Sequence, residues 1–208
     1  MRVFVIRHGE TDYNRARKMQ GYQEVPLNDR GIRQADLLAR RFMDEGIDQI
    51  VCSDLRRAVM TGCIVAARTG ASMAYDVGLR ERDPGELVES SYDAAPEFFT
   101  DESFVPVGGE AMAEFRARVR ETFTRIGECY ENQCKNLAVV SHGMVCQAFV
   151  SEFFGATASE GVGAGNATVS IANVDHGRWA LEEATCGAHL VEEASYPLTR
   201  TGSEATGA

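Results

Sequence analysis

Basic residues are scarce in this sequence. Its 208 residues include 21 Lys and Arg against 31 Asp and Glu, which gives a formal net charge of -10 at pH 7. No basic tract offsets this charge, so nucleic acid is excluded as a partner because its phosphate backbone would be repelled. A small anion can still bind if the few cations converge in one cleft.

Long apolar runs are also missing. None approaches the roughly 20 residues that a helix needs to cross a membrane. The first apolar segment is too short for a signal peptide, and a charged residue follows it directly. We therefore expect a cytoplasmic protein that does not enter a membrane. No repeat or linker divides the chain, and 44% hydrophobic residues suit one globular domain. Residues 196–208 are expected to form a flexible C-terminal tail.

Paired cysteines and common metal and nucleotide motifs are absent too. Neither HxxxH nor HExxH spacing occurs, and neither GxGxxG nor a P-loop follows an apolar strand. Metal and nucleotide sites of these types are therefore disfavoured. In the reducing compartment expected here, the cysteines are interpreted as free thiols rather than as disulfides or a zinc site. The six cysteines are Cys52, Cys63, Cys129, Cys134, Cys146 and Cys186.

One apolar segment is followed at once by chemistry-bearing residues. Residues 3–6 read Val-Phe-Val-Ile, and Arg7, His8 and Gly9 come next. A short, continuous and β-branched run predicts a strand buried on both faces of a parallel sheet. Ligands of open α/β sheets bind outside the carboxyl ends of such strands, where Arg7 and His8 would lie. Gly9 would let the backbone approach a ligand closely.

Two further apolar strands end in the same way. Residues 137–140 lead into Ser141-His142-Gly143, and residues 50–52 lead into a segment that carries Arg56 and Arg57. Because the carboxyl ends of parallel strands share one sheet edge, arginines and histidines from three segments should gather there. Arg57 is expected to face this site, with Arg56 as its solvated neighbour.

The intervening segments show helical spacing of apolar residues. Helices are predicted over residues 29–44, 54–68, 110–130 and 144–154, and a β-hairpin over 167–174 and 178–183. The first helix should begin after Asn28 and stop at Gly46. Its expected core residues are Ile32, Ala35, Ala39 and Phe42. This order predicts an α/β fold, a three-layer sandwich whose mostly parallel central sheet is flanked by helices.

Residues 75–109 have no such periodicity. Pro, Gly, Ser and acidic residues are mixed there with Phe98, Phe99 and Phe104. A long irregular segment inside a compact domain is typical of a lid or binding loop. The phenylalanines are expected to pack the lid rather than to stack against a substrate.

Two arginines and two histidines at one sheet edge suit a tetrahedral oxyanion. Guanidinium groups match phosphate geometry and keep their charge, whereas Arg7 beside His8 would repel a metal ion. A neutral imidazole of His8 or His142 could attack a bound phosphoryl group and form a phosphohistidine. The leaving alkoxide then needs a proton from a carboxylic acid. The candidates for that acid are Glu10, Glu81 and Glu86.

Over most of its length the chain resembles the histidine phosphatase superfamily, also called phosphoglycerate-mutase-like. The matching residues, in order, are Arg7-His8-Gly9-Glu10-Thr11 with Asn14, Gln20-Gly21, Pro26-Leu27 with Gly31 and Gln34-Ala35, Ser53-Asp54-Leu55-Arg56-Arg57-Ala58 with Thr61, and Ser141-His142-Gly143. The resemblance implies a phosphoglycerate-mutase-like fold in a single histidine-phosphatase-like domain over residues 1–195. It implies no metal and no other cofactor.

The resemblance also implies a role for each site residue. His8 would be the nucleophile, and Arg7, Arg57 and a cationic His142 would surround the phosphoryl group. Glu81 occupies the proton donor's position, although a salt bridge to Arg57 or Arg80 is the alternative. Relatives commonly show an aromatic residue and Glu-Gly after that glutamate, a pattern this chain lacks. The remaining phosphate contacts implied are Asn14, Gln20, Gly21 and the Gly143 amide.

Phosphatases and mutases of this family share the site, so the lid must distinguish them. The lid segment, residues 82–109, is short and rich in Asp and Glu. We expect such a lid to repel the second phosphate that a mutase must hold. The prediction is a metal-independent phosphomonoesterase whose partner is a small phosphorylated metabolite. Mutase-type phosphoryl transfer is one alternative, and an idle relative that binds an anion or a protein is another. The acidic lid and the apolar helix faces would also suit a homodimer surface.

Overall fold

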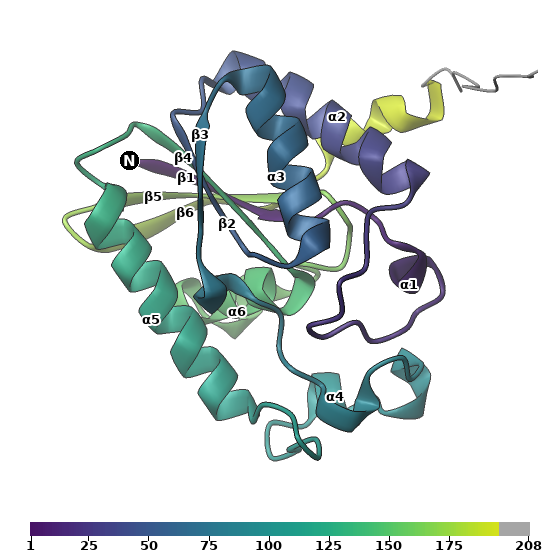
Figure 1. Cartoon of the computed structure of the whole chain (residues 1–208). Coiled ribbons are helices and arrows are strands. Elements are labelled where there is room, and N and C mark those ends of the chain that lie inside the picture. The colour runs from purple at the N-terminus through teal and green to yellow at the C-terminus, as the bar shows by residue number, and fades with distance from the viewer. Residues whose placement is uncertain (196–208) are drawn as a thin grey trace, which may run out of the picture.

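A six-stranded sheet forms the middle layer of the molecule (Figure 1). The computed structural model describes residues 1–195. The strand order is β3-β2-β4-β1-β5-β6, in which the first four strands run parallel and the last two add an antiparallel hairpin. The strands are β1 (Arg2–Arg7), β2 (Gln49–Cys52), β3 (Ser72–Tyr75), β4 (Asn136–Ser141), β5 (Val169–Asp175) and β6 (Arg178–Cys186). The predicted mostly parallel sheet is confirmed.

The two central strands place the site residues side by side. Residues 3–6 of β1 and 137–140 of β4 are fully buried, as their continuous apolar pattern predicts for strands covered on both faces. In the parallel register Arg7 lies opposite Ser141. His8 and His142, each one residue further on, therefore leave the sheet at the same edge.

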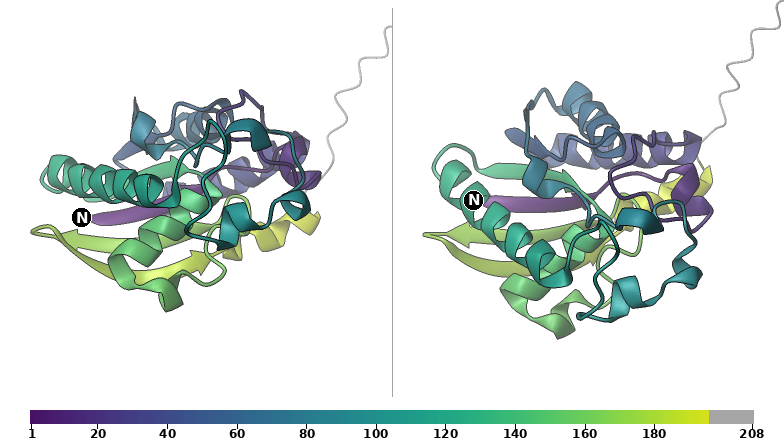
Figure 2. Two further views of the ribbon diagram at one scale, coloured as in Figure 1. Left: turned by 90° about the horizontal axis from the view of Figure 1, so that it is seen from below. Right: turned by 60° about the horizontal axis from the view of Figure 1, so that its bottom comes forward.

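Helices cover both faces of the sheet, which confirms the three-layer arrangement (Figure 2). On one face lie α2 (Asp29–Glu45) and α3 (Arg56–Thr69), and on the other lie α5 (Met112–Tyr130) and α6 (Gly143–Phe154). Alternate residues of β1 serve the two faces: Phe4 and Ile6 pack in the cluster of α2 and α3, and Val3 and Val5 pack in that of α5 and α6. Each face thus has its own apolar core.

The boundaries of α2 follow the predicted signals. The Asn28 side chain accepts a hydrogen bond from the Gly31 amide at 2.9 Å, and Gly46 ends the helix in a left-handed conformation with φ 67°. The prediction for Ile32 is wrong, because its side chain is 42% exposed. Residues 31, 35, 38 and 42 form the buried stripe, and Ile32 lies about 100° around the helix from the start of that stripe.

Other boundaries differ from the predictions by a few residues. Helices α3 and α5 begin two residues later than expected, and β6 continues to Cys186. The sequence analysis missed β3 (Ser72–Tyr75) entirely. This strand is short and lies at the sheet edge with its residues exposed or half-buried, so it has no continuous apolar run.

Short elements complete the described chain. The α-helices are α1 (Asp12–Arg15) and α4 (Glu97–Thr100), and the 3-10 helices are η1 (Val77–Leu79), η2 (Gly85–Leu87), η3 (Tyr92–Ala94), η4 (Ala156–Ser159) and η5 (Ala188–Ser195). All six cysteines are free thiols, as predicted. No helix within residues 1–195 is long and apolar enough to cross a membrane. The predicted tail, residues 196–208, lies outside the described residues, and the domain boundary at 195 and the homodimer stay predictions.

Candidate active site

His8 follows β1 directly and is almost completely buried. Its Nδ1 lies 2.7 Å from the Gly9 carbonyl oxygen, and its Nε2 lies 3.2 Å from the Arg57 Nε. A carbonyl only accepts and a guanidinium only donates, so Nδ1 carries the proton and Nε2 presents its lone pair. Burial, then the charges of Arg57 and Arg7, hold the pKa of His8 well below its usual 6.5. The imidazole is therefore neutral at pH 7.

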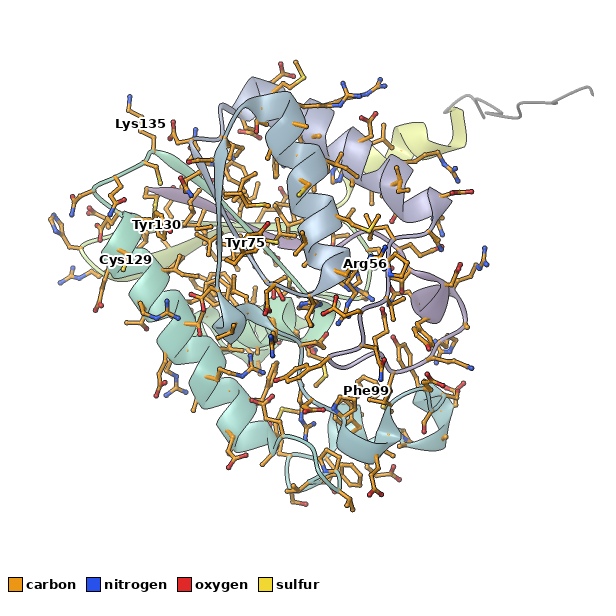
Figure 3. The ribbon with its side chains drawn as sticks, in the orientation of Figure 1. Arg56, Tyr75, Phe99, Cys129, Tyr130 and Lys135 are labelled. Carbon is orange, nitrogen blue, oxygen red and sulfur yellow. The ribbon has the colours of Figure 1, made fainter. Side chains whose placement is uncertain are left out.

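Arg57 is the second residue of α3, which begins shortly after β2 ends. Its side chain is buried and donates to the carbonyls of Gly21, at 2.9 Å, and Gln23, at 3.1 Å, besides contacting His8. Burial lowers the pKa of Arg57 to about 10, which still leaves it charged at pH 7. Arg56 is exposed, as expected for a solvated neighbour, and Figure 3 shows it at the N-terminal end of α3.

Arg7 reaches from the end of β1 to a glycine-rich loop. Its guanidinium donates to the carbonyls of Gly163 and Ala164 at 2.6 and 2.5 Å. Gly143 permits this approach, since a Cβ there would lie 2.9 Å from the Gly163 oxygen and 3.4 Å from the Arg7 Nε. The buried Arg7 Nε has no hydrogen-bond partner within the described residues. A donor left in this state costs about 1–3 kcal/mol, and an oxyanion would satisfy it.

His142 caps the start of α6 beside His8, with the ring centroids 5.2 Å apart. Its Nε2 lies 2.9 Å from the hydroxyl of Ser53, which also accepts the Leu55 amide. The hydroxyl can donate to Nε2 or accept from it, and the other ring nitrogen, Nδ1, is a buried atom with no partner among residues 1–195. Burial, then Arg57 and His8, hold the pKa of His142 well below 6.5. This environment favours the neutral ring over the cationic form.

Glu81 brings a carboxyl group to the same pocket. Its two oxygens accept the backbone amides of Arg82, at 3.0 Å, and Met144, at 3.2 Å. Burial raises the pKa of Glu81, against the opposing effect of these amides and of Arg57. The suggested salt bridge to Arg80 is not formed, because Arg80 pairs with Asp54.

The other two candidate acids are placed elsewhere. Glu10 accepts hydrogen bonds from Asn28 and from Arg30, at 3.0 and 2.9 Å, and does not line the pocket that holds His8. Glu86 is exposed on the lid. Among the three candidates, Glu81 alone lies beside His8.

Three further predicted contacts line the pocket in different ways. The Asn14 side-chain oxygen accepts from Thr11 and Asn166, which leaves its NH₂ group for a ligand. The Gln20 oxygen accepts the Thr11 hydroxyl. Gly21 offers its carbonyl to Arg57, so this group positions the guanidinium and cannot itself donate to a phosphate.

The pocket has two parts. An inner pocket of about 50 Å³ contains His8, Arg57, Gln20 and Gly21. It adjoins a wider outer cleft of about 560 Å³, and both parts share Arg7, Asn14 and Glu81. The lid residues Tyr92 and Phe99 line both parts, and Phe99 is 38% exposed on α4 (Figure 3). Phe98 is buried as expected, but Phe99 faces the cleft.

The lid carboxylates mostly do not face the cleft. Among the carboxylates of residues 82–109 only that of Asp93 lines the cleft, and Asp93 is paired with Arg17 at 2.8 Å. Others have partners of their own, such as Glu89 with the Tyr13 hydroxyl and Glu102 with Arg116. Repulsion of a second phosphate by direct contact with the lid acids would therefore depend on Asp93. Apart from Arg7, the described residues that line the cleft include no unpaired cation.

Clusters suited to a metal ion lie away from this pocket. In the described chain, one group of three side chains could hold a cation: Glu131, Asp175 and His176. It is at the β5–β6 turn, next to the amino end of β1 and so at the opposite end of the strands from His8. The cations that surround His8 are guanidinium groups.

Comparisons with known proteins agree with this geometry. A family model described as "Histidine phosphatase superfamily (branch 1)" matches residues 3–186. The chain belongs to this superfamily. One relative, "Probable phosphoglycerate mutase GpmB" of Erwinia tasmaniensis, is 32% identical over 217 residues, with 96% of this chain and 100% of the relative covered.

Solved structures of phosphatases are similar to this superfamily member along nearly their whole length. The alpha-ribazole phosphatase from Shigella flexneri has a TM-score of 0.78 at 25% identity, with 88% of this chain and 95% of that chain covered. The mycobacterial glucosyl-3-phosphoglycerate phosphatase, in its complex with VO3, has a TM-score of 0.76 at 27% identity, with 87% and 97% covered. Relatives of this superfamily member thus carry both phosphatase and mutase names.

Sequence reasoning missed several residues that shape the site. Ser53 orients His142, and Thr61 links the Gly9 amide, at 3.1 Å, to the Arg57 carbonyl. Both were part of the quoted family motif, but only their spatial neighbours reveal what they do. Asn166 binds the His8 carbonyl and Asn14 from a loop more than 150 positions away, and no local pattern pointed to it.

Proposed function

We propose that the protein is a metal-independent phosphomonoesterase that acts on a small phosphorylated metabolite through a phosphohistidine on His8. The observation that carries this proposal is the pair of contacts of His8, with Nδ1 held by the Gly9 carbonyl and Nε2 facing Arg57 in the inner pocket. This arrangement supplies a neutral nucleophile beside a permanent positive charge. His142 is less suited to attack, because it does not line the inner pocket, whereas His8 does.

In the first step, His8 Nε2 attacks the phosphorus in line with the ester oxygen. The N–P bond forms while the P–O bond to the alcohol breaks, and Glu81 donates its proton to the departing oxygen. In the second step, the Glu81 carboxylate accepts a proton from water as the water oxygen attacks phosphorus. The N–P bond breaks, inorganic phosphate forms and Nε2 recovers its lone pair.

Charge that develops on the phosphoryl oxygens is stabilised by Arg7 and Arg57. The Arg7 Nε and the His142 Nδ1, both buried without partners in the described chain, would donate to those oxygens. The amide end of α6, which begins at Gly143, adds its dipole. Asn14 and Gln20 complete the contacts at the rim of the inner pocket.

Phosphoglycerate mutase activity is the second candidate, and the name of the Erwinia tasmaniensis relative favours it. A mutase holds a substrate with two anionic groups, for which a second unpaired cation would be expected in the outer cleft. Arg17 lies there but is paired with Asp93. This observation favours water over a second substrate as the acceptor.

The test is hydrolysis of an aryl phosphate in EDTA by the wild type and by His8→Ala. We expect turnover by the wild type, none by the variant, and an acid-labile, base-stable phosphoryl group on His8 of rapidly quenched enzyme. Phosphoglycerate isomerisation that depends on a bisphosphoglycerate primer and exceeds hydrolysis would replace the phosphatase by the mutase. Phosphate binding without any turnover would indicate an idle relative.

A further inference from the structure

A half-buried ion pair lies behind the loop that carries Glu81. Arg118 of α5 holds Glu110 in a two-pronged contact, with Nε–Oε1 at 2.8 Å and Nη2–Oε2 at 2.7 Å. The two side chains are only 23% and 15% exposed. Neither residue lines the inner pocket or the outer cleft. Any effect on phosphoryl transfer must therefore pass through another residue.

The pair holds the backbone on both sides of Glu81. Arg118 donates to the carbonyls of Gly78 and Arg80, both at 2.8 Å, and to that of Glu81 itself at 3.3 Å. On the far side, the Glu110 amide donates to the Asp83 carbonyl at 2.9 Å. The Glu110 carboxylate also accepts the Asp83 amide at 3.4 Å.

This segment needs such support because regular structure does not supply it. Glu81 lies between η1 and η2 and belongs to neither a helix nor a strand. His8, Arg57 and His142, in contrast, stand at strand ends and helix starts. A carboxyl group on an irregular loop can donate its proton only if that loop is held within hydrogen-bond reach of the leaving oxygen.

We propose that the Glu110–Arg118 pair is a positioning device for Glu81, which fixes the proton donor relative to His8. This inference rests on the function proposed above. Stabilisation alone is a weak explanation for the pair, since ion pairs at the surface and in the interior often contribute little net stability. Arg118 also fits better than a lysine would, because its planar group serves three carbonyls and a carboxylate together.

The test compares an alkyl and an aryl phosphate, because only the alkoxide depends strongly on a proton donor. In Arg118→Lys, kcat/KM on the alkyl ester should fall by about 10- to 100-fold, the scale of a misplaced catalytic group. On the aryl ester it should fall by less than about threefold. The matched control is Arg120→Lys on the same helix, an exposed arginine that pairs with Glu152, and it should match the wild type on both esters.

A double-mutant cycle separates positioning from general stability. In a Glu81→Gln background, Arg118→Lys should cost nothing further on the alkyl ester, because the group that it positions is already removed. Equal losses on both esters, or losses that add to that of Glu81→Gln, would overturn the inference. Glu110→Gln provides the second variant and decides the matter if Arg118→Lys does not fold. Wild type and His8→Ala are assayed alongside, so absence of His8-dependent turnover would show that the proposed function itself, and the inference with it, is wrong.

Discussion

The strand-end site and the lid are built on different principles. His8, Arg57 and His142 are 2% exposed or less and lie where β1, β2 and β4 end side by side. The lid, residues 82–109, is made of short helices and turns, and much of it is exposed. One buried guanidinium, that of Arg82, holds it together through the carbonyls of Phe98, Phe104 and Glu110.

This difference separates the groups that would act on the phosphoryl group from those that would select the rest of the substrate. Groups at strand ends are fixed by the sheet register, so they can hold a phosphoryl group whatever alcohol it carries. The lid forms a wall of the outer cleft, where the alcohol would lie, and can change without disturbing the sheet. Glu81 lies between the two regions, since its carboxyl accepts an amide from α6 and another from Arg82.

The largest effect is expected for His8→Asn. Loss of the nucleophile should lower kcat/KM by at least about 10⁴-fold on aryl and alkyl esters alike. His176→Asn, at an exposed turn, is the control and should be unchanged. Residual phosphohistidine in His8→Asn, seen by acid and base stability of the trapped phosphoryl group, would point to His142 instead.

Arg57→Lys should follow, with a loss of about 10²- to 10³-fold on both esters. The lysine keeps a charge but cannot contact His8, Gly21 and Gln23 together, as the guanidinium does. Steady-state kinetics of Arg57→Lys beside Arg56→Lys tests this at neighbouring positions. A greater loss for Arg56→Lys would contradict the register of α3 at the site.

Glu81→Gln should lower kcat/KM by about 10²-fold on an alkyl ester and far less on an aryl ester. The raised pKa of Glu81 keeps the acid protonated to higher pH than an ordinary glutamate. Alkyl hydrolysis should then decline as pH rises through that pKa, and the decline should vanish in Glu81→Gln. The pH profile of both esters measures this, and a decline that persists in the variant would assign the acid elsewhere.

The buried histidines should also make the fold sensitive to acid. Their folded pKa values are held well below 6.5, so the unfolded chain binds protons that the folded chain does not. The free energy of unfolding should therefore decrease as pH falls below about 6.5, by up to about 1.4 kcal/mol per pH unit for each histidine. Denaturant titrations of wild type and His8→Asn test this, and identical pH slopes would contradict it.

The smallest effect is expected in the lid. Phe99→Ala removes a ring from the cleft wall, where it packs edge-on against Tyr92 at 5.1 Å. It should raise KM by about two- to tenfold for bulky phosphate esters and leave the smallest alkyl phosphate unchanged. Val105→Ala, an exposed lid residue outside the cleft, is the control. An equal change on all esters would mean that the lid also positions the phosphoryl group.

The sheet-edge part of this site follows from local patterns in the sequence. Residues 3–6 and 137–140 are continuous apolar runs, and such runs are stable only as strands buried on both faces. Parallel strands end at a common edge, so Arg7, His8 and His142 could be placed together before any coordinates. The helix caps Asn28 and Gly46 were equally local signals, because they depend on hydrogen bonds and backbone angles within a few residues.

The other features of the site depend on contacts between segments that are distant in the sequence. The choice of Glu81 over Glu10 came from Arg30 and Asn28, which already occupy the Glu10 carboxylate. His142 is neutral because the fold surrounds it with Arg57 and His8 away from water. The hold of Arg118 on the Glu81 loop follows from contacts across more than 30 positions of chain. Such long-range contacts leave no periodicity in the sequence, and for that reason no local pattern could predict them.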